Sequence, residues 1–347
     1  MVIKMVEFSS FEDASFVTHC GKFHADEVMA TVVLLELMKL YKRGSISDDD
    51  LGELANKFSN DSFNLCRVAA IWDDWNVNDK FIYDIGGRDY DHHQADRNGK
   101  RENGIFYSSV GLIWKSFGML LCRNVFPDSE DSAERLWLAI DRKLIQAIDA
   151  GDNGQFPEIT NGLPIINLDE LIGEFNPVWC ESQSLESQNR CFLKAVEFAD
   201  GIFNRLFKCE FAKVSVISAV NDAIEKSNDG IMILDKYIPW EEYLMGRDDP
   251  KAKGIMFAIL PSNRDEGCYT VMSPRDELGN SRMKLPKAWR GKRNEELEDY
   301  VEGGTFCHPN GFMAVADSLE HAISMARLAI MDSESDSDSD SEEAIAS

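Results

Sequence analysis

The sequence predicts an α/β fold with a largely parallel-sheet N-terminal domain and a smaller α/β C-terminal domain. The chain has 347 residues, and because domains average about 150 residues, this length favours two lobes. Its composition, 44% hydrophobic and 28% charged, is typical of a globular protein. Short apolar runs also alternate with helical patterns in the first half of the chain, as in parallel α/β sheets.

The N-terminal half shows this alternation element by element. Short apolar runs predict strands, and apolar residues that recur with helical spacing predict helices. The expected strands are 16–18, 67–71 and 81–85, and the expected helices are 26–41, 108–122 and 131–150. Gly86 and Gly87 follow the third strand and allow the chain to turn sharply there.

The C-terminal half contains one long helical region, 185–227, and a second set of short strands. Strands are expected at 231–234, 255–260, 269–272, 305–307 and 312–315, followed by a helix at 319–331. The predicted organisation is a metal-binding catalytic domain (1–184), a helical linker (185–227), a substrate-binding domain (228–331) and a tail (332–347).

Charge limits what the molecule can bind. The formal net charge is −25, and residues 332–347 hold seven acids and no base, which leaves −18 on the body. A general cationic surface for a nucleic-acid backbone is therefore absent, and a polyanionic substrate must be held by metal ions and local basic patches. The tail alternates serines with acids, which predicts disorder. We expect it to aid solubility or to be phosphorylated by an acidophilic kinase.

The sequence predicts residence in the cytoplasm or the nucleus, without excluding the mitochondrion. The N-terminus shows no signal-peptide or transit-peptide pattern. Eight cysteines are scattered without a CxxC pair, as is typical of reduced thiols. The longest apolar stretch, Val28 to Leu40, is interrupted by Glu36 and Lys39, so we expect no membrane span. No pattern indicates an oligomeric state.

Four segments concentrate histidine and aspartate side chains. They are His19-x4-His24-x-Asp26, Asp84, Asp91-His92-His93 and Asp149-x2-Asp152. Carboxylates and neutral imidazoles suit Mn²⁺, Mg²⁺ or Zn²⁺ in open catalytic sites, whereas closed structural zinc sites favour cysteines. Two cations roughly 4 Å apart need a bridging carboxylate, ligands on either side and a bridging water that becomes hydroxide. The segments therefore predict a centre for two divalent metal ions.

The predicted topology brings these segments together. His19 follows the first predicted strand, Asp84 lies at the end of the strand 81–85, and Asp91 comes after that strand, so all three are expected at the carboxyl edge of the sheet. Open parallel sheets bind ligands beyond the carboxyl ends of their strands. We therefore expect residues that are distant in sequence to meet in one cleft.

These segments also carry a resemblance to known proteins. Residues 18–27 (THCGKFHADE), 83–87 (YDIGG), 90–94 (YDHHQ) and 148–154 (IDAGDNG) resemble the four successive motifs of the DHH phosphoesterase superfamily. More narrowly, they resemble the melanocyte-proliferating-gene family, whose members are regarded as 3′→5′ RNA exonucleases. Residues 108–114, 288–291 and 322–327 resemble further landmarks of that family, so the resemblance covers nearly the whole chain before the tail.

The first three motifs imply metal ligands. By resemblance, His19 and His24 bind one metal ion, Asp26 and His92 bind the other, and Asp84 bridges the two. The metal ions are expected to be Mn²⁺ or Mg²⁺.

The remaining positions have more open roles. His93 is a further ligand or faces the substrate phosphate, and Asp91 is expected to orient a histidine rather than bind metal directly. In the fourth motif, Asp152-Asn153-Gly154-Gln155-Phe156 fits the Asp-x-Gly-x-Phe pattern of the superfamily, which favours Asp152 as a ligand. Asp149, three residues earlier, is the alternative.

The C-terminal domain departs from the family pattern. The family usually has a Gly-Gly-His stretch after a Gly-Phe dipeptide, whereas this chain continues Gly311-Phe312 with Met-Ala-Val-Ala. Basic residues between 282 and 293 are expected to compensate, with Arg290 and Arg293 binding phosphates and Trp289 stacking on a base. The alternative is a solvated basic loop paired with Glu295, Glu296 and Glu298.

The leading hypothesis is a divalent-metal-dependent phosphodiesterase, a 3′→5′ exonuclease acting on RNA or short oligonucleotides. A dinucleotide or pyrophosphate phosphoesterase is the alternative within enzymes, because the metal centre permits it equally. A catalytically impaired metal-binding regulatory protein is the alternative from another class, because the Gly-Gly-His stretch is missing.

Overall fold

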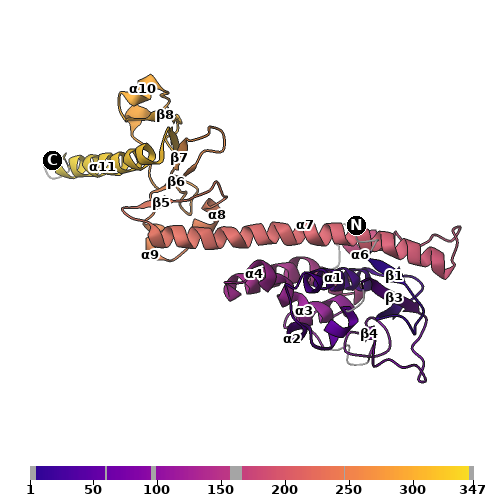
Figure 1. The fold of residues 1–347 in the computed structure, drawn as a ribbon. Helices are drawn as coiled ribbons and strands as arrows, with labels where there is room; N and C mark the ends of the chain where they lie inside the picture. The colour runs from indigo at the N-terminus through magenta and orange to yellow at the C-terminus, as the bar shows by residue number, and fades with distance from the viewer. Residues whose placement is uncertain (1–4, 59–60, 95–98, 157–165, 246, 344–347) are drawn as a thin grey trace. The chain divides into compact units, whose positions relative to one another are not determined.

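Two sheets organise the computed structural model. It describes residues 5–58, 61–94, 99–156, 166–245 and 247–343, with side chains placed as far as residue 333. The chain divides into two compact units, Met1–Ala212 and Lys213–Ser347. Each unit combines one sheet with helices, which confirms the predicted α/β class (Figure 1). The division falls inside α7 (Leu185–Lys226), one long continuous helix in the segment that we predicted as a linker.

The first unit is built on a four-stranded parallel sheet. Its order is β1-β3-β2-β4, with β1 at Val6–Phe8, β2 at Phe16–His19, β3 at Phe63–Val68 and β4 at Phe81–Ile82. In β2, Phe16, Val17 and Thr18 are fully buried, as expected for a strand covered on both faces. All four strands are parallel, so their carboxyl ends share one edge of the sheet.

Helices cover this sheet. Apart from α7, the longest helices of this unit are α1 (Ala25–Lys42) and α3 (Ser109–Val125), and they pack against each other. The predicted helix 131–150 is three consecutive segments, because a π-helical turn (Asp141–Ile145) joins α4 (Glu130–Ile140) to α5 (Gln146–Asp152). Shorter segments are α2 (Asp48–Leu51), a 3₁₀ helix (Gly52–Phe58) and α6 (Leu168–Gly173).

Three strands of this unit differ from the prediction. The strand expected at 81–85 is shorter, because only Phe81 and Ile82 of β4 pair with β2, through Phe16 and Val17. We expected a strand at 67–71, but β3 occupies Phe63–Val68 because its neighbours set its length: β1 pairs with residues 63–65 and β2 with residues 65–68. The strand β1 was not predicted, because Glu7 separates its two apolar residues, Val6 and Phe8, and leaves no apolar run.

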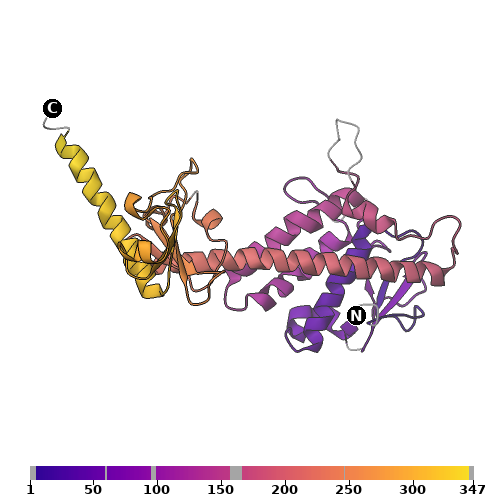
Figure 2. The same ribbon diagram turned by 90° about the horizontal axis from the view of Figure 1, so that it is seen from above.

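The second unit is built on a five-stranded mixed sheet of order β5-β6-β7-β9-β8. Its strands are β5 (Ile231–Ile233), β6 (Phe257–Pro261), β7 (Tyr269–Met272), β8 (Gly304–Cys307) and β9 (Met313–Ala316). Residues of α11 (Leu319–Glu343) share one core with this sheet, and the C-terminal part of α7 shares another (Figure 2). The short helices are α8 (Glu241–Leu244), α9 (Pro250–Lys253), α10 (Glu295–Glu298) and a 3₁₀ turn (Lys287–Trp289).

The backbone of the acidic segment is helical as far as Glu343, where we expected disorder. Helix α11 continues through this part of the segment. Extending an existing helix requires no new nucleation, so a buried amphipathic start allows the helix to run into a polar sequence. The side chains beyond residue 333 and all of residues 344–347 lie outside the described part, so disorder there stays a prediction. No helix among the described residues is long and apolar enough to cross a membrane.

Candidate metal centre

The loop between β2 and α1 presents the first two histidines. Arg67 of β3 holds this loop, because its Nε donates to the His19 carbonyl and its Nη2 to the Gly21 carbonyl, both at 3.1 Å. The guanidinium also lies over the Phe192 ring of α7, 4.6 Å from the centroid. Gly21 has a φ of 92°, a conformation that favours glycine. The backbone of the loop is thus fixed from its own sheet and from α7.

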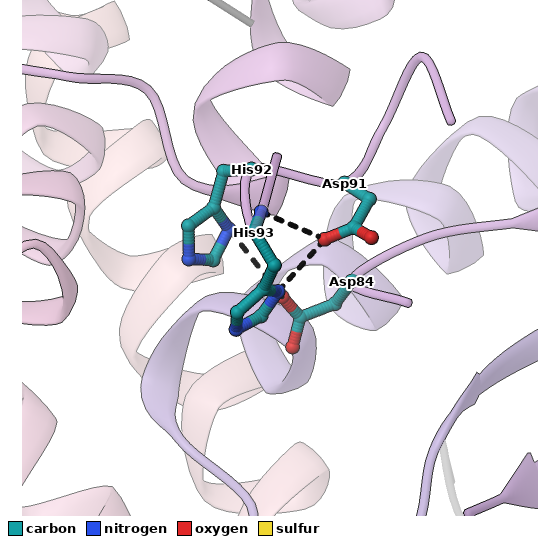
Figure 3. A group of neighbouring side chains, drawn as sticks. All are labelled: Asp84, Asp91, His92 and His93. Carbon is teal, nitrogen blue, oxygen red and sulfur yellow. Dashed lines mark hydrogen bonds and ion pairs between the residues drawn. The ribbon is translucent and has the colours of Figure 1, made fainter. Parts of the chain in front are cut away.

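The Asp84 carboxylate faces His92 and His93 (Figure 3). Asp84 follows the bridge between Tyr83 and Tyr90 and is buried with a φ of 58°, which is uncommon for a residue other than glycine. Its Oδ2 is 3.0 Å from Nε2 of His19, and its Oδ1 is 3.4 Å from Nδ1 of His92. One carboxylate therefore faces histidines from two different motifs, as a bridging ligand must.

Asp91 and His93 form a pair beside Asp84. The Asp91 Oδ1 atom is 2.7 Å from Nδ1 of His93, and its Oδ2 accepts a hydrogen bond from the Gly87 backbone N–H at 2.6 Å. Burial alone would raise the pKa of Asp91, but these hydrogen bonds outweigh it and lower the pKa to about 2. Asp91 thus orients His93, whose side chain is 61% exposed and lies against the His92 ring (Figure 3).

Two further carboxylates, those of Asp152 and Asp26, face His92. The His92 Nε2 atom is 2.7 Å from Oδ2 of Asp152, and the His92 Nδ1 atom is 3.8 Å from Oδ2 of Asp26. The Ser109 hydroxyl, at the start of α3, donates to that Asp26 oxygen at 2.8 Å. Helices α1, α3 and α5 therefore position these ligands together.

Asp149 lies outside this cluster. Its Oδ1 accepts from the Ser108 backbone N–H at 2.9 Å and from the Ser108 hydroxyl at 2.6 Å, and its Oδ2 pairs with Arg101. Arg101 also pairs with Asp141 at 2.8 Å. A side chain at Gly111 would overlap the Asp149 carboxylate. Of the two alternatives in the fourth motif, the structure brings Asp152 to the site and commits Asp149 to a buried ion-pair network.

Glu27 belongs to the site although the sequence analysis did not select it. It is fully buried, its Oε1 is 2.8 Å from Nε2 of His19, and its Oε2 accepts from the His24 backbone N–H at 2.9 Å. The signal was present in the sequence, because an acid three residues after His24, at the start of a helix, is the spacing of a capping box.

The cluster has the properties of a cation site. Four overlapping groups bring donor atoms within 4.8 Å of one another: Asp84-Asp91-His92-His93, His19-His24-Glu27, His24-Asp26-Asp152 and Asp26-Glu27-Asp84. Among the described residues, nine buried side-chain nitrogen or oxygen atoms make no hydrogen bond outside ion-pair contacts with histidine, and six of the nine belong to this cluster. Buried polar groups are normally paired, so these atoms fit metal ligands.

The pKa values show excess negative charge. Burial and the neighbouring Asp26 carboxylate raise the pKa of Asp84 well above its usual range. Burial alone would lower the pKa of His19, but hydrogen bonds with Asp84 and Glu27 outweigh it and raise that pKa to about 11. In the absence of metal, protons thus compensate carboxylates that a divalent cation would neutralise.

The predicted basic strip is corrected by the structure. Trp289 is buried in the core of the second unit, so the prediction that it stacks on a base is wrong. Arg290 donates from Nε and Nη2 to the Leu285 carbonyl at 2.9 and 2.8 Å. Its guanidinium thus holds the backbone of its own loop, and its predicted role in binding phosphate stays a prediction. Arg293 remains exposed over the Phe306 ring, and its substrate role stays a prediction. Trp289 is the last residue of the 3₁₀ turn Lys287–Trp289 and the one residue of that turn that is buried.

Comparisons with known proteins agree with the motifs. The family model MYG1_exonuc, described as an uncharacterised protein family (UPF0160), matches residues 15–330. The chain is 28% identical to "MYG1 protein YER156C" of Saccharomyces cerevisiae, over 94% of this chain and 99% of that protein. It is 25% identical to "MYG1 exonuclease" of Homo sapiens, over 90% of this chain and 85% of that protein. No solved structure matches significantly. Because the family model spans most of its length, the chain belongs to the MYG1 family.

Proposed function

We propose that the first unit is a divalent-cation-dependent phosphodiesterase that removes nucleotides from RNA or short oligonucleotides in the 3′→5′ direction. The observation that carries this proposal is the buried cluster around Asp84, where imidazoles and carboxylates from four segments face one another and six buried donor or acceptor atoms make no hydrogen bond outside the ion-pair contacts within the cluster. The name "exonuclease" given to the human and rodent relatives and the resemblance to DHH phosphoesterases support the reaction class.

The donor set suits two hard divalent cations, Mn²⁺ or Mg²⁺. Asp84 would be shared, with His19, His24 and Glu27 on one side and Asp26, His92 and Asp152 on the other. When bound, such cations lower the pKa of a coordinated water and neutralise phosphate oxygens.

The chain's own residues supply orientation and proton transfer. Arg67 and Ser109 hold ligands in place through hydrogen bonds. His93, which is exposed and paired with Asp91, would hold a substrate phosphate or give a proton to the leaving oxygen.

A 5′-labelled RNA incubated with Mn²⁺, with and without a chelator, tests the proposal. A descending ladder that disappears with the chelator supports the exonuclease. Cleavage of dinucleotides alone would support the small-molecule alternative. Metal binding without any product would support the regulatory alternative and contradict the proposed activity.

A further inference from the structure

Trp179 has the most exposed large hydrophobic side chain among the described residues. It is 92% exposed, and Val178 beside it is 51% exposed. A buried tryptophan removes about 150–250 Å² from water, so this position leaves that surface available to a ligand. The two residues lie in the loop between α6 and α7 (Figure 1).

The loop has a defined conformation. The Val178 backbone N–H donates to Oε2 of Glu181 at 3.0 Å. The Gln183 side chain donates to the carbonyls of Val178 and Glu181 at 2.9 and 3.2 Å. Trp179 is therefore presented by a turn that its own side chains stabilise, and little ordering is required when a ligand binds.

The same loop is hydrogen-bonded to the residue that precedes His24 of the metal centre. Asn176 accepts from the Phe23 backbone N–H at 2.9 Å and donates to the Phe23 carbonyl at 2.8 Å. Phe23 precedes His24, which belongs to two of the candidate cation groups. Trp179 is three residues after Asn176, so the two Cα atoms are within about 11 Å. Gly21 is likewise held by the Gln188 side chain, so the loop that carries Trp179 lies beside residues 21–23, which lead into the centre.

A cation lies in the loop to which Asn176 is bonded. Lys22, between Gly21 and Phe23, is exposed, and no carboxylate pairs with it in the described part of the chain. Unpaired basic groups are notable in a molecule of net charge −25.

We propose that Trp179 and Lys22 form a nucleotide subsite on the rim of the metal centre, where the indole stacks on a nucleobase and the ammonium pairs with a phosphate. The substrate class rests on the proposed function. One exposed ring and one cation match one nucleotide, whereas a stable protein interface needs about 1,000 Å² or more. Stacking accepts any base, because every base has a π-face.

Fluorescence anisotropy of a short labelled RNA with the full-length protein in EDTA tests the subsite without turnover. Trp179→Ala should weaken binding about 5- to 30-fold, whereas Trp179→Phe should retain most of the affinity. Lys22→Ala should weaken binding and make its salt dependence shallower. Leu171→Ala removes another exposed apolar side chain, on α6, and should change nothing. Unchanged melting temperatures would exclude a folding defect.

An abasic oligomer of equal length gives the decisive comparison. The wild-type protein and Trp179→Ala should bind the abasic oligomer with the same affinity, because no base remains to stack on the indole. The subsite would be overturned if Trp179→Ala lost the same affinity for both oligomers, or if it bound RNA as tightly as the wild type does. Competition by a nucleoside monophosphate would show that a free nucleotide binds there, and its absence would restrict the subsite to strand ends. If RNA binding depends on Trp179 but the protein does not hydrolyse RNA, the subsite is supported and the proposed function is contradicted. If the protein hydrolyses RNA normally and Trp179→Ala binds RNA as tightly as the wild type does, the proposed function is supported and the subsite is contradicted.

Discussion

At the scale of single residues, the site contains buried carboxylates and an unusual backbone conformation, both of which destabilise a folded protein. Asp84 is buried, adopts a φ of 58° and lies among other acids that, after burial itself, raise its pKa. Such positions are unfavourable in the free protein, and they are typical of functional sites. The arrangement is understandable if cations neutralise the carboxylates.

Replacing Asp84 by asparagine should separate function from stability. Asp84→Asn should reduce phosphodiesterase activity to below about one-hundredth of the wild-type rate, because an amide has no charge to share between cations. The melting temperature in EDTA should stay equal or rise, since the substitution removes a buried carboxylate whose raised pKa disfavours the folded state above that carboxyl's ordinary pKa. Asp128→Asn, at an exposed acid, is the control. Activity near the control's level would exclude the bridging role.

Asp149 and Asp152 should respond differently to the same substitution. Asp149→Asn leaves Arg101 with one partner fewer in a buried network, so the free energy of unfolding should fall by about 3 kcal/mol. Asp152→Asn should leave thermal stability nearly unchanged but weaken Mn²⁺ binding, because Asp152 faces His92 at the site. Thermal denaturation and Mn²⁺ titration of both variants measure this difference. A reversed pattern would make Asp149 the ligand.

Metal binding should release protons. His19, with its pKa raised to about 11, is protonated in the metal-free protein at neutral pH and must lose that proton to bind a cation. Apparent Mn²⁺ affinity should therefore rise with pH between 6 and 8, by about tenfold per unit for each proton released. Calorimetry in two buffers of different ionisation enthalpy counts these protons. A pH-independent affinity without proton release would show that His19 is no ligand.

At the scale of elements, most helices and strands follow from periodicity, but the site's supporting groups do not. The order and types of the main elements agree with the prediction, because buried strands such as β2 and long helices such as α1 carry strong apolar patterns. The carboxylate cluster also follows from spacing and from the rule for parallel sheets. Arg67, Arg101 and Trp289 could not be assigned, since tertiary contacts over 40 or more residues, or the direction of a single turn, decide whether such side chains are buried.

Arg67 tests how β3 supports the loop after β2. A lysine in its place cannot reach the His19 and Gly21 carbonyls in a fork, nor stack as well on Phe192. Arg67→Lys should therefore weaken Mn²⁺ affinity about 10- to 100-fold, as is usual for groups that orient ligands. Arg190→Lys, at an exposed pair on α7, is the matched control. Equal Mn²⁺ affinities in both variants would show that the loop keeps its form without Arg67.

At the scale of the whole molecule, charge and chemistry are distributed unevenly. The candidate metal centre lies in the first unit, whereas the acidic segment ends the second. A net charge of −25 repels polyanions at long range. Local cations such as Lys22 and bound metal must therefore overcome a general repulsion before any nucleic acid is held.

Deleting residues 334–347 tests how much of that repulsion comes from the tail. The deletion begins after Ser333, whose hydroxyl still donates to the Ile330 carbonyl at 2.7 Å, and it removes six acids and no base. The melting temperature and kcat should stay unchanged, because a polar segment contributes little to the core. KM for RNA should fall at low salt and stay unchanged at high salt, where ions screen the tail from the substrate.

A variant in which serines replace the six acids should behave like the deletion if charge is the cause. A KM that falls equally at both salt concentrations would instead indicate that the tail blocks the substrate sterically, and a lower melting temperature would show that the end of α11 stabilises the second unit.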